Sequence, residues 1–210
     1  MPQPADRARP YGGRSADDRR AERRARLVEA TVRVVGGRGE GAATMTAICA
    51  EAGLTERYFY ESFDKREVAL VAALDHVADR LATEAVRAIA QTAGTPTDRV
   101  HAGLSALVQW VDDEPLAARV ALVESSSHPD LRARRRQLLG TFADLVVTEA
   151  GVLYGAAAWT GARGRAQGLL LASGFAELVA ARLTGDAQLS AEELVDIGTT
   201  SFERLTRSTP

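Results

Sequence analysis

Hydrophobic residues recur every three or four positions along most of this chain, which is the spacing of one face of an α-helix. No convincing run of alternating apolar and polar residues, typical of a strand, interrupts this pattern. Glycine, proline and serine residues divide it into segments, so the sequence predicts an all-α fold of about nine helices. The expected helices span residues 16–35, 44–52, 55–63, 65–92, 97–111, 115–125, 129–153, 164–183 and 190–207.

Residues 44–63, TMTAICAEAGLTERYFYESF, predict two short helices joined by a tight turn. Thr44 is expected to cap the first helix, and Ile48 and Ala52 lie one turn apart on its inward face. Gly53 is expected to take the positive backbone angle that ends this helix. Two short helices with this connection are typical of a helix-turn-helix unit.

The second short helix is expected to start at Thr55 and to turn Phe59 and Phe63 inward. The residues left on its outer face are Arg57, Tyr58, Tyr60 and Glu61. Tyrosine hydroxyl and guanidinium groups bind phosphate oxygens and base edges, so this face indicates a helix that reads DNA. The alternative is a packed helical hairpin with incidental aromatic residues.

This segment resembles the TetR family of bacterial transcription regulators. The resemblance covers residues 20–74, and the matching positions are Thr44, Ile48, Cys49, Ala52, Gly53, Leu54, Thr55, Phe59, Tyr60, Phe63 and Arg66. The departures are Cys49 in place of alanine, Arg57 and Tyr58 in place of small residues, and Arg66 in place of lysine. The resemblance implies a three-helix DNA-binding domain, a helical domain that binds a ligand and dimerises, and a repressor that a small molecule releases from a palindromic operator.

DNA contact is therefore assigned to residues of the helix-turn-helix and of the start of the next helix: Thr44, Thr46, Thr55, Arg57, Tyr58, Tyr60, Lys65 and Arg66. Arg57 is expected to read a base edge, and Tyr58 to contact phosphate or a thymine methyl group. The remaining aromatic and basic residues would grip the DNA backbone. Glu61 would either accept a hydrogen bond from cytosine or orient Arg57, four residues earlier on the same face.

Charge and composition divide the chain into three parts. The first 66 residues carry a formal charge of +3 and the rest −5, which fits a DNA-binding domain at residues 18–66 followed by a ligand-binding and dimerisation domain at residues 67–210. Residues 1–17 are rich in proline, glycine and arginine and are expected to form a disordered, solvated basic arm. The alternative is that Arg7, Arg9 or Arg14 reaches the minor groove or a phosphate group.

The middle of the second domain is expected to enclose a cavity for a small molecule that the sequence does not identify. Its expected lining is Leu107, Trp110, Val111, Arg119, Val120, Val123, Glu124 and Phe142, in which the polar residues would orient the ligand. Arg119 and Glu124 are five residues apart, which is not an ideal spacing for an ion pair on one helix face. The alternative is that these residues fill an ordinary helical core.

The last two helices are expected to form a homodimer interface. Small residues recur every four positions in the helix from Gly164, which permits close helix approach, and apolar residues follow in the final helix. The expected interface residues are Gly168, Leu171, Ala172, Phe175, Leu178, Val179, Leu194, Ile197, Phe202 and Leu205. The alternative is a core within one chain.

Other classes of protein are not expected. The serines at 125–127 beside His128 lack the context of a catalytic relay, so the chain is not expected to be an enzyme. The scattered histidines give no metal site, and no cofactor is expected. A single cysteine and the absence of a run of about 18 apolar residues favour a cytoplasmic protein without a membrane partner. The functional alternative is an architectural protein with the same DNA-binding head and no ligand cavity.

Overall fold

The computed structural model describes residues 15–158 and 160–207, and this part of the chain is helical without any strand. The predicted all-α fold and its nine α-helices are confirmed there. The α-helices are α1 (Ala16–Arg38), α2 (Met45–Ala52), α3 (Glu56–Tyr60), α4 (Arg66–Gln91), α5 (Pro96–Asp113), α6 (Pro115–Leu122), α7 (Pro129–Tyr154), α8 (Gly161–Thr184) and α9 (Ala191–Arg207). Three short 3-10 helices join them: η1 (Glu40–Ala42), η2 (Glu124–Ser126) and η3 (Gly155–Ala157).

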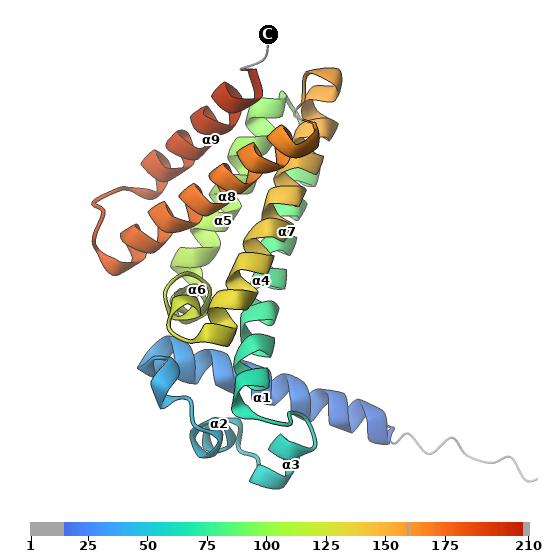
Figure 1. Ribbon diagram of the computed structural model, residues 1–210, viewed down its shortest axis with the longest axis vertical. Helices are drawn as coiled ribbons and strands as arrows, with labels where there is room; N and C mark the ends of the chain where they lie inside the picture. Colours follow the sequence, from blue (N-terminus) through green and yellow to red (C-terminus); the bar gives the residue numbers. More distant parts are fainter. Residues whose placement is uncertain (1–14, 159, 208–210) are drawn as a thin grey trace, which may run out of the picture.

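Two regions are visible in Figure 1, a small head made of α1 to α3 and a larger body made of α4 to α9. We define the head as residues 15–65 and the body as residues 66–207. Helix α4 runs from the head into the body, and α1 packs on both α4 and α6. Within the body, α8 packs mainly on α7, and α9 mainly on α5.

The start of the chain differs in part from the expected arm. Residues 1–14, with their three arginines, lie outside the described residues. Ser15 caps α1 by accepting a hydrogen bond from the backbone N–H of Asp18, and the Asp18 carboxylate accepts one in return from the backbone of Ser15. Ala16 and Asp17, which were expected both at the end of the arm and at the start of the first helix, are therefore the first residues of a capped helix.

Helix α1 continues beyond its expected end at residue 35, through Gly36 and Gly37 to Arg38. At this point α1 meets α6. A Cβ atom added at Gly36 would lie 2.9 Å from the Cα atom of Leu116 and would overlap its carbonyl oxygen. Glycine is thus required at position 36 for a contact between two helix backbones, which the local sequence pattern does not reveal.

The core of the head is tightly filled. Ile48 of α2, Phe59 and Phe63 belong to the same hydrophobic core as Leu27 of α1, and all four side chains are at most 2% exposed. The only cysteine, Cys49, is buried beside them, and burial, assisted by the charge of Glu56, raises the pKa of its thiol. The same core continues through α4 into the body.

Candidate DNA interface and ligand cavity

Helix α2 and the turn after it have the expected geometry. The Thr44 hydroxyl caps α2 by accepting a hydrogen bond from the backbone N–H of Ala47 at 3.1 Å. Gly53 adopts the left-handed conformation, with φ of 61°, and the N–H of Leu54 donates to the carbonyl oxygen of Cys49. These bonds satisfy the helix ends and direct the chain sharply into α3.

Helix α3 is shorter than predicted, because it ends at Tyr60 rather than at Phe63. Thr55 stands at its N-cap position, and its side chain makes no capping hydrogen bond. The side chain of Arg57 is 84% exposed, and Tyr60 is 58% exposed. The helix therefore presents a guanidinium group and a phenol hydroxyl to solvent, both of which can donate to phosphate or to base edges.

Three arginines of α1 hold the two short helices in place. The guanidinium of Arg23 lies 4.6 Å from the centre of the Tyr58 ring, and that of Arg24 lies 4.3 Å from the centre of the Phe63 ring. Arg26 donates to the carbonyl oxygen of Ala52 at 2.7 Å, at the end of α2. Sequence patterns alone place this arginine cluster in solvent and miss its role, although Arg23 and Arg26 have the spacing of one helix face.

The expected outward position of Tyr58 is only partly correct. Its ring is half-buried beneath Arg23, so less of it is available to DNA than of Tyr60. Glu61 accepts a hydrogen bond from Nε of Arg57 at 3.1 Å and lies 3.5 Å from Nη2 of Arg23. In the free protein Glu61 thus orients Arg57, which is the second of the two roles considered for it.

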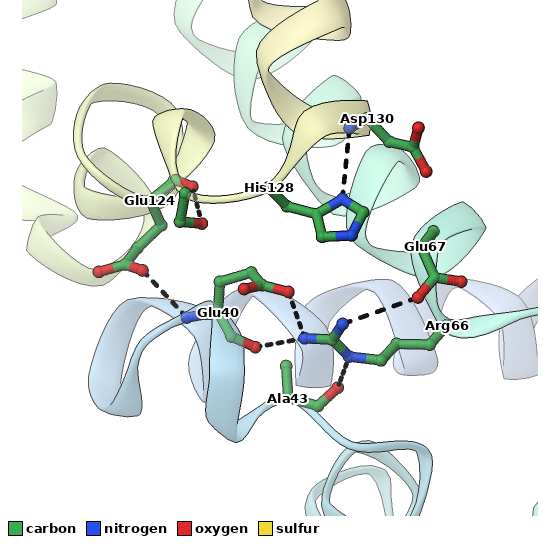
Figure 2. A network of polar contacts seen from close by, with 8 residues as sticks. Glu40, Ala43, Arg66, Glu67, Glu124, His128 and Asp130 are labelled. Carbon is green, nitrogen blue, oxygen red and sulfur yellow. Dashed lines mark hydrogen bonds and ion pairs between the residues drawn. The ribbon is translucent and has the colours of Figure 1, made fainter.

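Arg66 does not have the expected position of a phosphate-binding residue. Figure 2 shows its guanidinium turned into the head, where Nε donates to the carbonyl oxygen of Ala43 at 2.8 Å and Nη2 donates to the carbonyl oxygen of Glu40 at 2.6 Å. The Glu40 carboxylate also accepts from Nη2, and the Glu67 carboxylate lies 3.7 Å from Nη1. All three guanidinium nitrogens are occupied, so Arg66 ties the start of α4 to the segment before α2.

The other assigned residues lie at exposed positions. Lys65 is the N-cap of α4 and is exposed, as are Thr44 and Thr55. Thr46 is exposed as well, and its hydroxyl donates to the Glu56 carboxylate at 3.3 Å. The candidate DNA interface therefore consists of residues from α2 and α3, their N-cap residues and the residue before α4, without Arg66.

The body contains a cavity of about 180 Å³ that is partly open to solvent and is lined by residues of helices α4 to α9. Its wall is formed by Leu74, Ala78, Leu81, Leu104, Leu107, Val111, Ala121, Leu122, Arg135, Leu138, Leu139, Phe142, Val146, Leu171, Ala172, Phe175, Ala176, Val179, Gly198 and Phe202. Of the described residues that form this wall, only Arg135 is charged. The cavity therefore suits a small molecule that is mostly apolar.

Comparison with known sequences gives one partial match, and no protein-family model matches the chain. Over 80 residues the chain is 36% identical to the HTH-type transcriptional regulator BetI of Rhizobium meliloti (strain 1021). These residues are 38% of this chain and 39% of BetI, so the match spans about two fifths of the length of that relative.

Solved structures match almost the whole chain. A TetR-like transcriptional regulator from Rhodococcus sp. RHA1 aligns with a TM-score of 0.66 and 18% identity, over 90% of this chain and 98% of that one. FadR from Bacillus subtilis, solved with stearoyl-CoA, aligns with a TM-score of 0.68 and 17% identity, over 89% and 99%. This chain has the TetR-like fold. AibR, solved with isovaleryl coenzyme A and operator DNA, shares it with a TM-score of 0.60 and 16% identity, over 84% and 96% of the two chains.

The cavity of this TetR-like chain has a different wall from the one that the sequence predicted. Leu107, Val111 and Phe142 line it as expected, whereas Trp110, Arg119, Val120, Val123 and Glu124 do not. Val120 is buried in the core, and the Trp110 ring lies 5.6 Å from the guanidinium of Arg80. The sequence pattern identified apolar positions but not which of them face the cavity, because that depends on how six helices pack.

The two polar residues expected in the cavity join the head to the body instead. Arg119 donates to the carbonyl oxygen of Gly36 at 3.1 Å, and Glu124 accepts from the backbone N–H of Glu40 at 2.9 Å, as Figure 2 shows for the second contact. They also lie 3.4 Å from each other despite their unfavourable spacing. This is possible because α6 ends at Leu122 and the chain turns before Glu124.

Most of the residues assigned to a dimer interface lie within the chain. Leu171, Ala172, Phe175, Val179 and Phe202 line the cavity, and Leu194 is in the core. Gly168 packs on α7, where an added Cβ would lie 2.7 Å from the carbonyl oxygen of Ala143. Leu178 and Leu205 are half-buried against other residues of the chain. The exposed large apolar residues of α8 and α9 are Leu169, Leu170 and Ile197.

Two described helices are long and apolar enough to cross a membrane by length and composition alone, α7 with η3 and then α8. Only 11% and 17% of their most apolar stretches are buried within the chain. Two helices of this kind are weak evidence for a membrane span, and they do not contradict the expectation of no membrane partner. Because they are so exposed, α7 and α8 present apolar surface, which includes Val152 and Leu170.

Proposed function

We propose that this TetR-like chain is a sequence-specific DNA-binding transcription regulator, a repressor whose operator affinity falls when a small molecule occupies the body. The observation that carries the proposal is the geometry of α2, Gly53 and α3, which holds the exposed side chains of Arg57 and Tyr60 on a rigid, fully packed support. A side chain on such a support loses little freedom when it binds, which favours recognition of a defined base sequence.

The residues have different roles in this proposal. Arg57 reads a base edge, for which the bidentate guanidinium is suited. Tyr60, Lys65 and the hydroxyls of Thr44, Thr46 and Thr55 contact the DNA backbone, with Tyr58 as a contact at the edge of the interface. Since Lys65 is the N-cap residue of α4, its amino group adds its charge to that of the helix N-terminus.

The cavity supports a ligand-responsive regulator over an architectural DNA-binding protein. An architectural protein needs no cavity, whereas a chamber of about 180 Å³ walled by apolar side chains is a site for a small molecule. FadR and AibR, which share the fold, were solved with CoA thioesters, and AibR also with operator DNA. By analogy, this chain binds a ligand with an apolar part, and occupation of the ligand site changes its affinity for DNA.

The regulator is proposed to act as a homodimer in the cytoplasm. The exposed residues Leu169, Leu170 and Ile197 of α8 and α9 supply apolar surface that a second copy would cover. A two-fold dimer would present two α3 helices to a palindromic operator. Analytical ultracentrifugation tests this part, and a monomer at micromolar concentration would contradict it.

The function is tested by fluorescence anisotropy with the DNA that adjoins the gene of the protein, against a scrambled duplex of equal length at physiological salt. We expect binding to the adjoining DNA to be at least about a thousandfold tighter than binding to the scrambled duplex. Equal, salt-sensitive binding to both duplexes would support the architectural alternative and overturn the proposed function.

A further inference from the structure

A cationic side chain stands at one position of a cavity wall whose other described residues are uncharged. Arg135 of α7 lines the cavity together with Leu138, Leu139 and Phe142, which follow it by one and two turns on the same helix. The wall therefore combines an apolar surface with one guanidinium group. A guanidinium that is mostly out of water requires an anionic or polar partner, which a purely apolar ligand does not supply.

The present partner of Arg135 is Glu177 of α8, whose carboxylate accepts from Nη2 of Arg135. The two side chains differ in exposure, 20% for Arg135 and 65% for Glu177. An exposed carboxylate keeps most of its hydration and can leave the pair at little cost. If Glu177 leaves, the guanidinium of Arg135 needs another anion as its partner. The ion pair therefore allows an anionic ligand to replace Glu177.

The surroundings of Arg135 favour an anion further. Four of the seven residues 131–137 are arginine and none is acidic. Arg134 is paired with Asp75 of α4 at 2.5 Å, and Arg132 donates to the carbonyl oxygen of Ser126. This concentration of positive charge attracts an anionic group to the part of the cavity wall that Arg135 forms.

The volume limits the apolar part of the ligand. A cavity of 150 Å³ lined by similar apolar residues binds benzene, so a chamber of about 180 Å³ suits an apolar group of about six to eight carbon atoms. We propose that the cavity binds an amphipathic anion of this size, whose head group replaces Glu177 on the guanidinium of Arg135. The head group is either a free carboxylate or the anionic part of a CoA thioester. This inference rests on the proposed function for its regulatory role, but not for the binding itself.

Isothermal titration calorimetry with the full chain tests the inference with octanoate, octanoyl-CoA and the neutral analogue 1-octanol. We expect at least one of the two anions to bind about ten- to a hundredfold more tightly than 1-octanol, because its head group makes a charge-assisted bond. Tighter binding of octanoate identifies a free acid, and tighter binding of octanoyl-CoA identifies a thioester. Equal affinity of all three, or no binding of either anion, would overturn the inference.

Matched variants locate the anion. Arg135→Gln should remove the advantage of the anion and leave 1-octanol unchanged, whereas Arg136→Gln, an exposed neighbour outside the cavity wall, should change neither. Glu177→Gln should raise the affinity for the anion several-fold, because the competing carboxylate is gone. An equal loss in both arginine variants, or a Glu177→Gln variant that binds the anion more weakly, would contradict the assignment.

The anisotropy measurement on the same preparations separates this inference from the proposed function. An anion that binds through Arg135 to a protein without sequence-specific DNA binding would sustain the inference and overturn the function. Specific DNA binding combined with equal affinity for octanoate, octanoyl-CoA and 1-octanol would sustain the function and overturn the inference.

Discussion

In the head, Ile48, Phe59 and Phe63 fill the space between three helices and are at most 2% exposed, whereas in the body six helices line a cavity of about 180 Å³. Both regions are built from the same kinds of side chain. The difference is that the apolar residues of the head pack against one another in a single core, whereas many of those in the body line a cavity. A region that holds side chains for recognition gains from full packing, and a region that receives a ligand must leave space unfilled.

The largest expected difference between the regions comes from removing a phenylalanine ring in each. Phe59→Ala should lower the free energy of unfolding by about 3 to 5 kcal/mol, because it leaves a void in a closed core. Phe175→Ala should cost roughly half as much, since the Phe175 ring is half-buried and already borders the cavity. Urea unfolding followed by circular dichroism measures both. Equal costs would show that the cavity wall is packed as tightly as the head.

Two neighbouring glycines of α1 test the contact between the regions. Gly36→Ala should destabilise the protein by about 1 to 3 kcal/mol, because the new methyl group would overlap the backbone of Leu116 in α6. Gly37→Ala is the control, since its nearest neighbour would be a Leu116 side-chain atom at 4.0 Å, and it should stabilise the helix by about 0.5 to 1 kcal/mol. The melting temperatures of the two variants should therefore shift in opposite directions. Shifts in the same direction would exclude a rigid contact between α1 and α6.

The recognition role of the head is tested by Arg57→Ala. The variant should lose about 1 to 3 kcal/mol of binding free energy at the cognate operator and less on unrelated DNA, because a base contact is lost while the fold is kept. Anisotropy titrations on the two duplexes measure the difference. An equal loss on both would remove Arg57 from base reading and leave it as a backbone contact.

Adjacent basic residues separate DNA contact from head structure. Lys65→Ala should reduce the slope of log K against log salt by about 0.9 for each subunit, because one phosphate contact disappears. Arg66→Ala should leave this slope unchanged and lower the melting temperature, because its hydrogen bonds to Ala43 and Glu40 are internal. A reduced slope in the Arg66 variant would show that its guanidinium leaves these partners and binds DNA.

The smallest expected effect is a loss of stability at low pH, and it arises in both regions. Hydrogen bonds from the N-cap residue lower the pKa of Asp18 in the head and of Asp98 and Glu193 in the body. Below about pH 4 the folded state therefore binds fewer protons than the unfolded state. The contribution of these carboxylates to the free energy of unfolding is complete above this range and is lost as the pH falls through it. Asp98→Asn should lower Tm slightly at pH 7 and less at pH 3. An equal decrease at both values would contradict a charge effect.

The sequence predicted the helices well because their signals are local. The prolines at 96, 115 and 129 begin α5, α6 and α7. Thr44 and Gly53 are the cap residues at the two ends of α2, as expected. The resemblance to TetR regulators was confirmed for the fold. The candidate interface of the head could also be proposed from the sequence, since its residues are close together in the chain.

The features that the sequence did not predict depend on contacts between distant segments. Arg66 and Lys65 are neighbours of similar charge, and only the approach of the segment before α2 turns one of them inward. In α8, apolar residues occur on several sides, so the pattern could not separate Phe175, which lines the cavity, from Leu170, which is exposed. Arg135 was missed because an arginine in a charged segment gives no sign that it faces a cavity.

The bond between the Glu124 carboxylate and the backbone of Glu40 has a thermodynamic consequence. Ala121 and Leu122 touch the cavity, and Glu124 follows them at the head, so both sites share one short segment. Under the proposed function, any coupling free energy that this contact carries between the ligand cavity and the DNA interface is reciprocal. If the ligand lowers affinity for the operator by a given factor, the operator lowers affinity for the ligand by the same factor. Molecules bound at operators would then respond only at higher ligand concentrations than molecules free in solution.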